Sequence, residues 1–252
     1  MHELLFTKVL NGVLAGPVTA LLQAVGIHPA NPKAPIPDHV SMQLLLVAVL
    51  AILFLIVRSQ LSVESPGGLQ HVIEGAYGFV SNLGKEIIGH GYEDFMPYLM
   101  TLGIFILCAN LMGLIPGLES PTANPVVPLG CALVTWFYYQ LQGITRNGPI
   151  KYLQHFIGPQ DHDIPFVMRM ILPLLMFPIE IFSHLARLLS LTVRLYANMF
   201  AGEMVTLVFF SLIPIGIPVI FQGLHIGVSF IQTYIFVLLA CVYLGEATAH
   251  EH

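Results

Sequence analysis

The chain has 252 residues, of which 56% are hydrophobic and only 9% are charged, and its mean hydropathy is +0.81. Soluble domains carry about 25% charged residues, so this composition excludes an ordinary soluble domain and indicates an all-α polytopic membrane protein. A formal net charge of −5 provides no basic surface for nucleic acid. Three isolated cysteines in apolar segments, Cys108, Cys131 and Cys241, favour neither a disulfide nor a metal framework.

Residues 1–40 are predicted to form an external amphipathic segment followed by a proline-rich linker. The apolar stretch 4–25 is interrupted by polar residues and helix breakers, and its Met-His-Glu start lacks the basic region of a signal peptide. An interfacial amphipathic helix is therefore the better interpretation, and composition leaves open whether the segment is retained. Four prolines between residues 26 and 40 indicate an extended linker.

Residues 41–252 are predicted to form a single membrane domain with about five to six membrane helices. The expected spans are about 41–57, 95–115, 126–145, a long tilted or bent span at 166–213, and 219–245. Between the first two, the weakly apolar segment 64–94 indicates an amphipathic helix along the membrane surface. Pro173 and Pro178 are candidate kinks in the long span. No internal repeat supports an inverted-repeat carrier.

Basic residues outside the spans predict the orientation of the chain. An external amino terminus leaves Lys8 and Lys33 outside and places five basic residues on the cytoplasmic side, namely Arg58, Lys85, Arg146, Lys151 and Arg169. This distribution obeys the positive-inside rule and puts the carboxyl terminus in the cytoplasm.

The mostly apolar stretch 165–213 is the most informative part of the chain, because it carries Arg169, Glu180, His184, Arg187, Arg194 and Glu203. A charged side chain at the centre of a membrane costs roughly 2.5–3.5 kcal/mol, so ionisable residues there are candidates for a functional site. At about 100° per residue, Glu180, Arg187 and Arg194 follow one face of a helix, with Asn198 one turn further. Glu203 points to roughly the opposite side.

Arg194 keeps its charge at any accessible pH and therefore needs an anion. Glu180 lies about 21 Å away along the helix, and Glu203 faces elsewhere. The partner is therefore expected on a neighbouring helix, possibly one that belongs to another chain. The alternative is a structural arginine that reaches an interface or pairs with backbone carbonyls.

The last predicted span places His225, Ser229 and Gln232 on one face. If it packs as an antiparallel hairpin against the preceding helix, His225 and Gln232 come near Glu203 and Asn198. Glutamate and histidine exchange protons near neutral pH once burial has shifted their pKa values, and such chains suit an intramembrane proton relay. Each residue alone is also typical of packing between membrane helices, but the set with Glu203 favours the relay.

A specific pattern surrounds Arg194: Leu191-Thr-Val-Arg194-Leu-Tyr-Ala-Asn198-Met-Phe-Ala-Gly-Glu203, followed by IQTYIFVLLACVYLGEA in the last span. Upstream stand Pro66-Gly-Gly-Leu-Gln, ILCANLMGLIPG and Ser120-Pro-Thr-Ala-Asn124. Together these segments resemble subunit a of the F-type ATP synthase over roughly residues 64–246. Many members of that family have an aspartate and threonines where this chain reads Asn124-Pro-Val-Val-Pro, so the turn is assigned no role.

The resemblance implies a non-catalytic stator subunit without cofactor or metal. Its implied partners are a rotating ring of c subunits, the peripheral stalk b subunits and the lipid of the bacterial inner membrane. Its implied function is to couple proton translocation through two half-channels to rotation of the c-ring and hence to ATP synthesis.

The resemblance also implies which residues carry the proton. By similarity, the half-channel from the external side is lined by Glu203, Asn198, His225 and Gln232. The half-channel toward the cytoplasm has Glu180 and Ser190 at matching positions, with His184 close by. Arg194 lies between the two and faces the ring carboxylate.

Two other classes of protein fit part of the pattern. A free-standing proton- or sodium-coupled carrier would use the same buried ions, but it needs its own anion for Arg194 and a substrate cavity. A metal-dependent membrane enzyme has less support, because His155 and His162 lack ligand spacing and His250-Glu-His252 is typical of a solvated end. The chain has no phosphate-binding Gly-rich loop, so no ATP chemistry is expected in it. The choice of H+ over Na+ and the ring stoichiometry stay open.

Overall fold

The computed structural model describes residues 5–24, 26, 31, 34–62, 67–115, 118–148, 166–213 and 216–248. These residues form helices and no strand, which confirms the all-α class. The elements are α1 (Leu5–Ala24), α2 (Asp38–Gln60), α3 (Gly68–Ile87), η1 (Tyr92–Phe95), α4 (Met96–Met112), η2 (Pro121–Ala123), α5 (Val126–Asn147), α7 (Phe166–Leu212) and α8 (Ile217–Thr248). Some residues used in the sequence predictions lie outside the described residues: the Met1–Glu3 start, two of the four linker prolines (Pro29 and Pro32), Lys33, Pro66, Lys151, His155, His162 and His250–His252.

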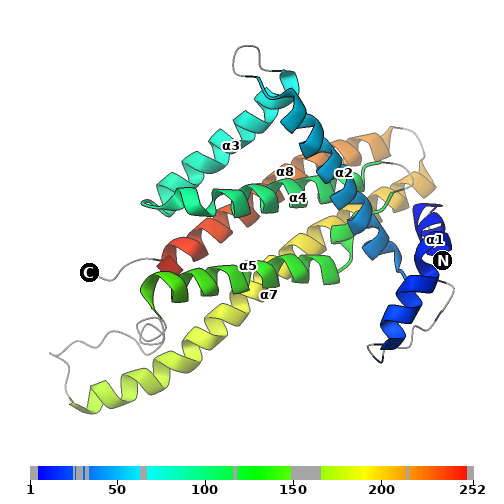
Figure 1. Cartoon of the computed structure of the whole chain (residues 1–252). Helices are drawn as coiled ribbons and strands as arrows, with labels where there is room; N and C mark the ends of the chain where they lie inside the picture. Colours follow the sequence, from blue (N-terminus) through cyan, green and yellow to red (C-terminus); the bar gives the residue numbers. More distant parts are fainter. Residues whose placement is uncertain are drawn as a thin grey trace.

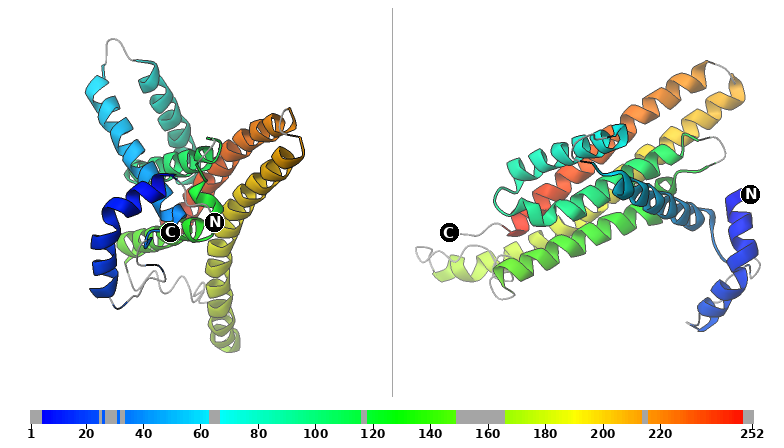
Figure 2. Two further views of the ribbon diagram at one scale, coloured as in Figure 1. Left: turned by 90° about the vertical axis from the view of Figure 1, so that its right-hand side faces the viewer. Right: turned by 45° about the horizontal axis from the view of Figure 1, so that its top comes forward.

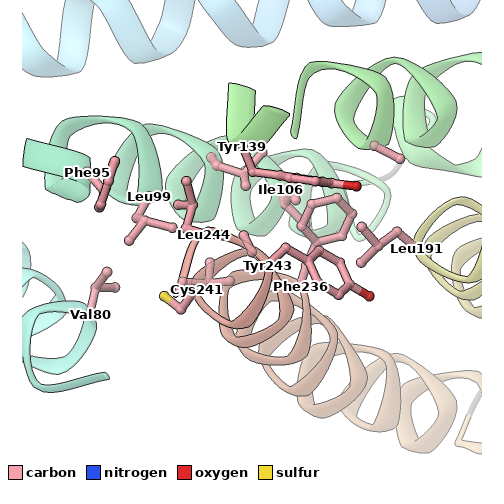
Figure 3. Packing of buried hydrophobic residues seen from close by; sticks show 14 of the residues in the cluster. Val80, Phe95, Leu99, Ile106, Tyr139, Leu191, Phe236, Cys241, Tyr243 and Leu244 are labelled. Carbon is pink, nitrogen blue, oxygen red and sulfur yellow. The ribbon is translucent and has the colours of Figure 1, made fainter. Parts of the chain in front are cut away.

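Helices α4, α5, α7 and α8 form the body of the molecule, and α8 packs against the other three (Figure 1). The core-facing residues of α8, Phe236, Ala240 and Leu244, recur every fourth position and are fully buried. Figure 3 shows Phe236 together with Tyr139 of α5 and Leu191 of α7 in this core. In lipid, such contacts stabilise the bundle through close packing, since lipid tails are as apolar as the side chains themselves.

Helices α2 and α3 form a V at the edge of this body, in contact with α4 (Figure 1). α2 is apolar on all sides, and much of its surface, including Leu44, Val47 and Leu55, is exposed, as expected of a lipid-facing span. α3 is the helix predicted within 64–94, and it packs against α4 and α8. Its position along the membrane surface stays a prediction.

Helix α1 is attached to the start of α2 by two polar contacts. The side-chain amide of Asn11 donates to the Ile36 carbonyl (3.2 Å) and accepts from the Ile36 N–H (3.1 Å). The hydroxyls of Thr7 and Ser41 lie 2.6 Å apart. The predicted helix at 4–25 is therefore present, and its interfacial, external location stays a prediction.

The predicted spans correspond to helices with shifted ends. Four described segments are long and apolar enough to cross a membrane, namely Asp38–Gln60, Tyr92–Met112, Leu174–Leu212 and Ile217–Thr248. The third predicted span, 126–145, is present as α5 but is not among these four. α5 is less apolar than the other spans. Two of its polar side chains, Thr135 and Tyr139, are buried in the protein and do not face lipid. α5 packs against α7 and α8, and its crossing of the membrane stays a prediction.

Helix α7 runs through 47 residues without interruption, with Pro173 and Pro178 inside it. At 1.5 Å per residue it is about 70 Å long, more than twice the thickness of a hydrocarbon layer, so it must tilt or bend. Figure 2 shows that it curves along its length. With α8 it forms the predicted hairpin of long helices.

Candidate functional site

Arg194 lies in the interior of α7 and is half-buried. Its guanidinium donates to Ser190 Oγ (3.1 Å), one turn earlier on the same helix. Among the described residues, no carboxylate lies within ion-pair distance of Arg194. The neighbouring side chains Leu189, Val193 and Phe200 are exposed and apolar. The cation therefore borders a surface that other parts of the described chain leave uncovered.

One turn beyond Arg194, a polar contact joins α7 to α8. Asn198 Nδ2 donates to Gln232 Oε1 (2.8 Å), and Gln232 is buried. The hairpin thus brings together two residues that are 34 positions apart in the sequence. This contact was expected, because the polar face of the last span was predicted to bring Gln232 near Asn198.

Glu203 and His225 lie further along the same hairpin. The ring of His225 packs on Gly202, where a methyl group would come within 2.6 Å of Nδ1. His225 is only 7% exposed, and its Nε2 has no hydrogen-bond partner among the described residues. Glu203 points to η2 instead, and its Oε1 accepts a hydrogen bond from the Ser120 N–H (3.0 Å). His225 therefore lies beside the residue that precedes Glu203, and the Glu203 carboxylate bonds to the Ser120 backbone.

A group of polar residues beside Glu203 was not among the predicted site residues. Ser120 Oγ donates to the Ala109 carbonyl (3.0 Å) and lies 2.7 Å from Thr122 Oγ1, which donates to Asn110 Oδ1 (2.7 Å). Asn110 is fully buried, and its Nδ2 has no partner among the described residues. The signal was present in the sequence as an amide inside an apolar span and a hydroxyl-rich turn after it. Their meeting with Glu203 depends on tertiary contacts.

The same end of the molecule carries additional carboxyl groups. Glu119 precedes Ser120 in the turn after α4, and partial burial and the charge of Asp38 raise the pKa of its carboxyl. Gly113 leaves room for the Glu203 carboxylate, since a methyl group there would lie 2.8 Å from Oε1. The turn that received no role from the sequence therefore forms part of the surroundings of Glu203.

On the other side of Arg194, a second polar group joins α7 to α5. His184 is 9% exposed, and its Nε2 lies 3.4 Å from Glu180 Oε1. Its Nδ1 lies 2.8 Å from the hydroxyl of Tyr139. Glu180 and His184 were predicted site residues, whereas Tyr139 was not, because a tyrosine inside a span is usually read as packing.

Arg187 stands close to this second group and has its own anion. It forms an ion pair with Glu246 near the end of α8, and its guanidinium lies 4.9 Å from the centre of the Tyr243 ring. The two arginines of one helical face thus differ, because Arg187 is paired within the chain and Arg194 has no such partner among the described residues.

Two separate polar groups therefore lie along α7, each completed by residues from neighbouring elements, and Arg194 lies between them. The first contains Asn198, Glu203, Gln232, His225 and Ser120, and the second contains Glu180, His184 and Tyr139. Within the described part of the chain, no cluster of three or more His, Cys, Asp or Glu side chains is arranged for a metal ion. Each group contains a carboxyl and an imidazole that can bind and release protons, Glu203 with His225 in the first and Glu180 with His184 in the second.

Comparison with known proteins identifies the family. The family model for the ATP synthase A chain matches residues 40–245. ATP synthase subunit a of Koribacter versatilis is 57% identical over 251 residues, which cover 100% of this chain and 99% of the relative. The same subunit of Solibacter usitatus is 49% identical over 96% of this chain and 99% of the relative, and that of Sulfurihydrogenibium is 39% identical over 85% and 99%. The chain therefore belongs to the ATP synthase A chain family, that of subunit a in the membrane sector of the ATP synthase.

Proposed function

We propose that this chain is the stator that guides protons to and from a ring of c subunits through two half-channels, with Arg194 as the coupling charge. The observation that carries the proposal is the position of Arg194. It lies between two separate polar groups, borders an exposed apolar surface and has no carboxylate partner among the described residues.

The missing anion is the carboxylate of a c subunit. A permanent cation inside a membrane requires an anion nearby, and the exposed side chains Leu189, Val193 and Phe200 provide an apolar surface for a second helical protein. A free-standing carrier would need this anion within its own chain. Arg194 favours the ionised form of a carboxylate that passes it, and so promotes release of its proton.

The two polar groups provide the two paths. From the external side, a proton passes the Ser120–Glu203 contact, His225 and the Asn198–Gln232 pair and neutralises a ring carboxylate. The neutral site then enters lipid at a tolerable desolvation cost. After nearly a full turn, it releases the proton toward the cytoplasm by way of Ser190, His184 and Glu180. The membrane potential contributes about 2.3 kcal/mol per charge per 100 mV.

The proposed stator function also implies where the chain is located and which subunits it contacts. The chain is a multi-pass protein of the bacterial inner membrane, with an external amino terminus and a cytoplasmic carboxyl terminus. It contacts the c-ring and the peripheral stalk b subunits. Rotation of the ring drives nucleotide chemistry in other subunits, so this chain is not itself a catalyst.

The experiment is ATP-driven acidification of inverted membrane vesicles that carry Arg194→Ala, with assembly of the complex checked by immunoblot. The matched control is Arg58→Ala, which removes an exposed arginine at the end of α2. We expect acidification to vanish in Arg194→Ala and to persist in Arg58→Ala, with both complexes assembled. Acidification at the normal rate in Arg194→Ala would show that the arginine is structural.

A further inference from the structure

Tyr139 of α5 contacts His184 of α7, which belongs to the proposed cytoplasmic proton path. The phenol oxygen of Tyr139 lies 2.8 Å from His184 Nδ1, and the two rings stack at 5.8 Å with an interplanar angle of 22°. Tyr139 is only 2% exposed and His184 9%. Burial and stacking together restrict both the position and the rotation of the imidazole.

The contact determines which nitrogen of His184 is available for proton transfer. A phenol both donates and accepts hydrogen bonds, so Tyr139 satisfies Nδ1 whether that nitrogen carries a proton or a lone pair. The other nitrogen, Nε2, faces the Glu180 carboxylate at 3.4 Å. Proton exchange with Glu180 therefore takes place at Nε2, and α5 fixes this choice.

Several charged or titratable groups surround this pair. Glu180 and Arg187 belong to α7, and Tyr243 and Glu246 belong to α8. Tyr243 packs against Tyr139 with ring centres 5.8 Å apart, and it also lies under the Arg187 guanidinium. Arg187 in turn is paired with Glu246. These contacts tie the charges of Arg187 and Glu246 to each other, and among the described residues Glu180 is a carboxylate beside the imidazole.

We propose that Tyr139 is a positioning residue of the cytoplasmic half-channel, which holds the His184 imidazole so that Nε2 exchanges protons with Glu180. The inference rests on the proposed function. In the transfer step, the Nε2–H bond of the imidazolium breaks and an O–H bond forms on Glu180, so that both charges disappear. The ring keeps its Nδ1 proton, and this Nδ1–H donates a hydrogen bond to the Tyr139 phenol oxygen. During ATP synthesis, Glu180 then releases its proton to cytoplasmic water and Nε2 takes up the next one. In ATP-driven acidification the same steps run in reverse, from Glu180 to Nε2.

The test is Tyr139→Phe, which removes the hydroxyl and keeps the ring. The matched control is Tyr138→Phe, the same change at the next residue, whose ring stacks on Tyr98 at 3.9 Å. The readout is ATP-driven acidification of inverted vesicles as a function of the pH of the medium, which bathes the cytoplasmic face. Assembly of the complex is measured in parallel.

We expect Tyr139→Phe to lower the rate about 2- to 10-fold, the range for loss of one buried hydrogen bond. The pH of half-maximal rate should also fall by about half to one unit, because the hydrogen bond from a charged imidazolium is stronger than that from a neutral ring. Tyr138→Phe should match the wild type in both measurements. In a His184→Gln background, Tyr139→Phe should have no further effect on the rate that remains.

The inference is overturned if Tyr139→Phe leaves the pH profile in place, whether the rate is unchanged or is lowered equally at all pH values with less assembled complex. If His184→Gln has no activity of its own, the pH profile of the single variant Tyr139→Phe still decides whether Tyr139 positions the imidazole. Failure of the proposed function is distinguishable, since it would appear as normal acidification in Arg194→Ala.

Discussion

Gly202 shows how a single residue controls the surroundings of Glu203. The ring of His225 occupies the space where any other residue would place its side chain, with Nδ1 2.6 Å and Cε1 2.9 Å from the position of a methyl group. Gly202 is inside α7, where glycine costs roughly 0.5–1 kcal/mol relative to alanine. The close approach of the imidazole is therefore a reason for glycine at a position that helix propensity alone would not favour.

The corresponding prediction concerns Gly202→Ala. The added methyl group has to displace the His225 ring, and overpacking of this kind typically costs about 1–3 kcal/mol, more than the gain in helix propensity. We expect a lower melting temperature of the detergent-solubilised complex and a lower rate of ATP-driven acidification. The control is Gly130→Ala in α5, where a methyl group meets nothing within 4 Å of the chain. Equal behaviour of the two variants would contradict the geometry at Gly202.

One residue contact followed from helical spacing together with the expected hairpin. Asn198 and Gln232 were expected to meet because each lies on the polar face of its helix and the helices are joined by a short turn. The contacts of Ser120 with Glu203 and of Tyr139 with His184 did not follow in this way. Each joins α7 to an element from a distant part of the sequence. The direction of approach of those elements is decided by packing of the whole bundle, which no local pattern contains.

Helix α7 is the element on which both polar groups depend. One side of it packs on α5 and α8, whereas residues such as Leu189 and Val193 are exposed on the other. Its length was readable from the sequence, and so were the two prolines that it contains. Whether these prolines would divide it was not readable, because neighbouring helices and hydroxyl side chains can satisfy the freed backbone groups in a membrane. The structure has a single continuous helix.

The exposed surface of α7 leads to a prediction at the level of the element. A cysteine at Val193, which is 56% exposed, should form a disulfide with a cysteine placed beside the ring carboxylate of subunit c. The measurement is oxidative cross-linking of vesicles that lack Cys108, Cys131 and Cys241, read as an a–c product on a gel. A cysteine at Val47 of α2, which is 53% exposed, serves as a control that should give no such product. Cross-linking at Val47 and none at Val193 would place the ring against α2 and contradict the proposed contact with α7.

For the whole molecule, composition was sufficient to predict an all-α membrane protein, and hydropathy was sufficient to predict four of the five spans. α5 was predicted as a span, although it is less apolar than the other four and is not among the segments that qualify by hydropathy. The reason is structural, since its polar residues point into the bundle, where Thr135 pairs with Tyr98 (2.8 Å) and Tyr139 pairs with His184. The V of α2 and α3 was not predictable, because their apolar surfaces contain no information on the angle between them.

For the whole molecule, the proposed function requires that Arg194 separates two proton paths. A fixed cation repels a passing proton, most strongly where water is scarce. Its removal should therefore join the two paths while leaving the polar groups on either side intact.

This separation can be measured as passive proton flow through vesicles stripped of the nucleotide-hydrolysing sector. With the membrane complex assembled, Arg194→Ala vesicles are predicted to conduct protons at least as fast as wild-type vesicles, although they no longer acidify with ATP. Proton-tight Arg194→Ala vesicles would rule out this role, because they would mean that the arginine is needed for protons to move at all and does not keep two paths apart.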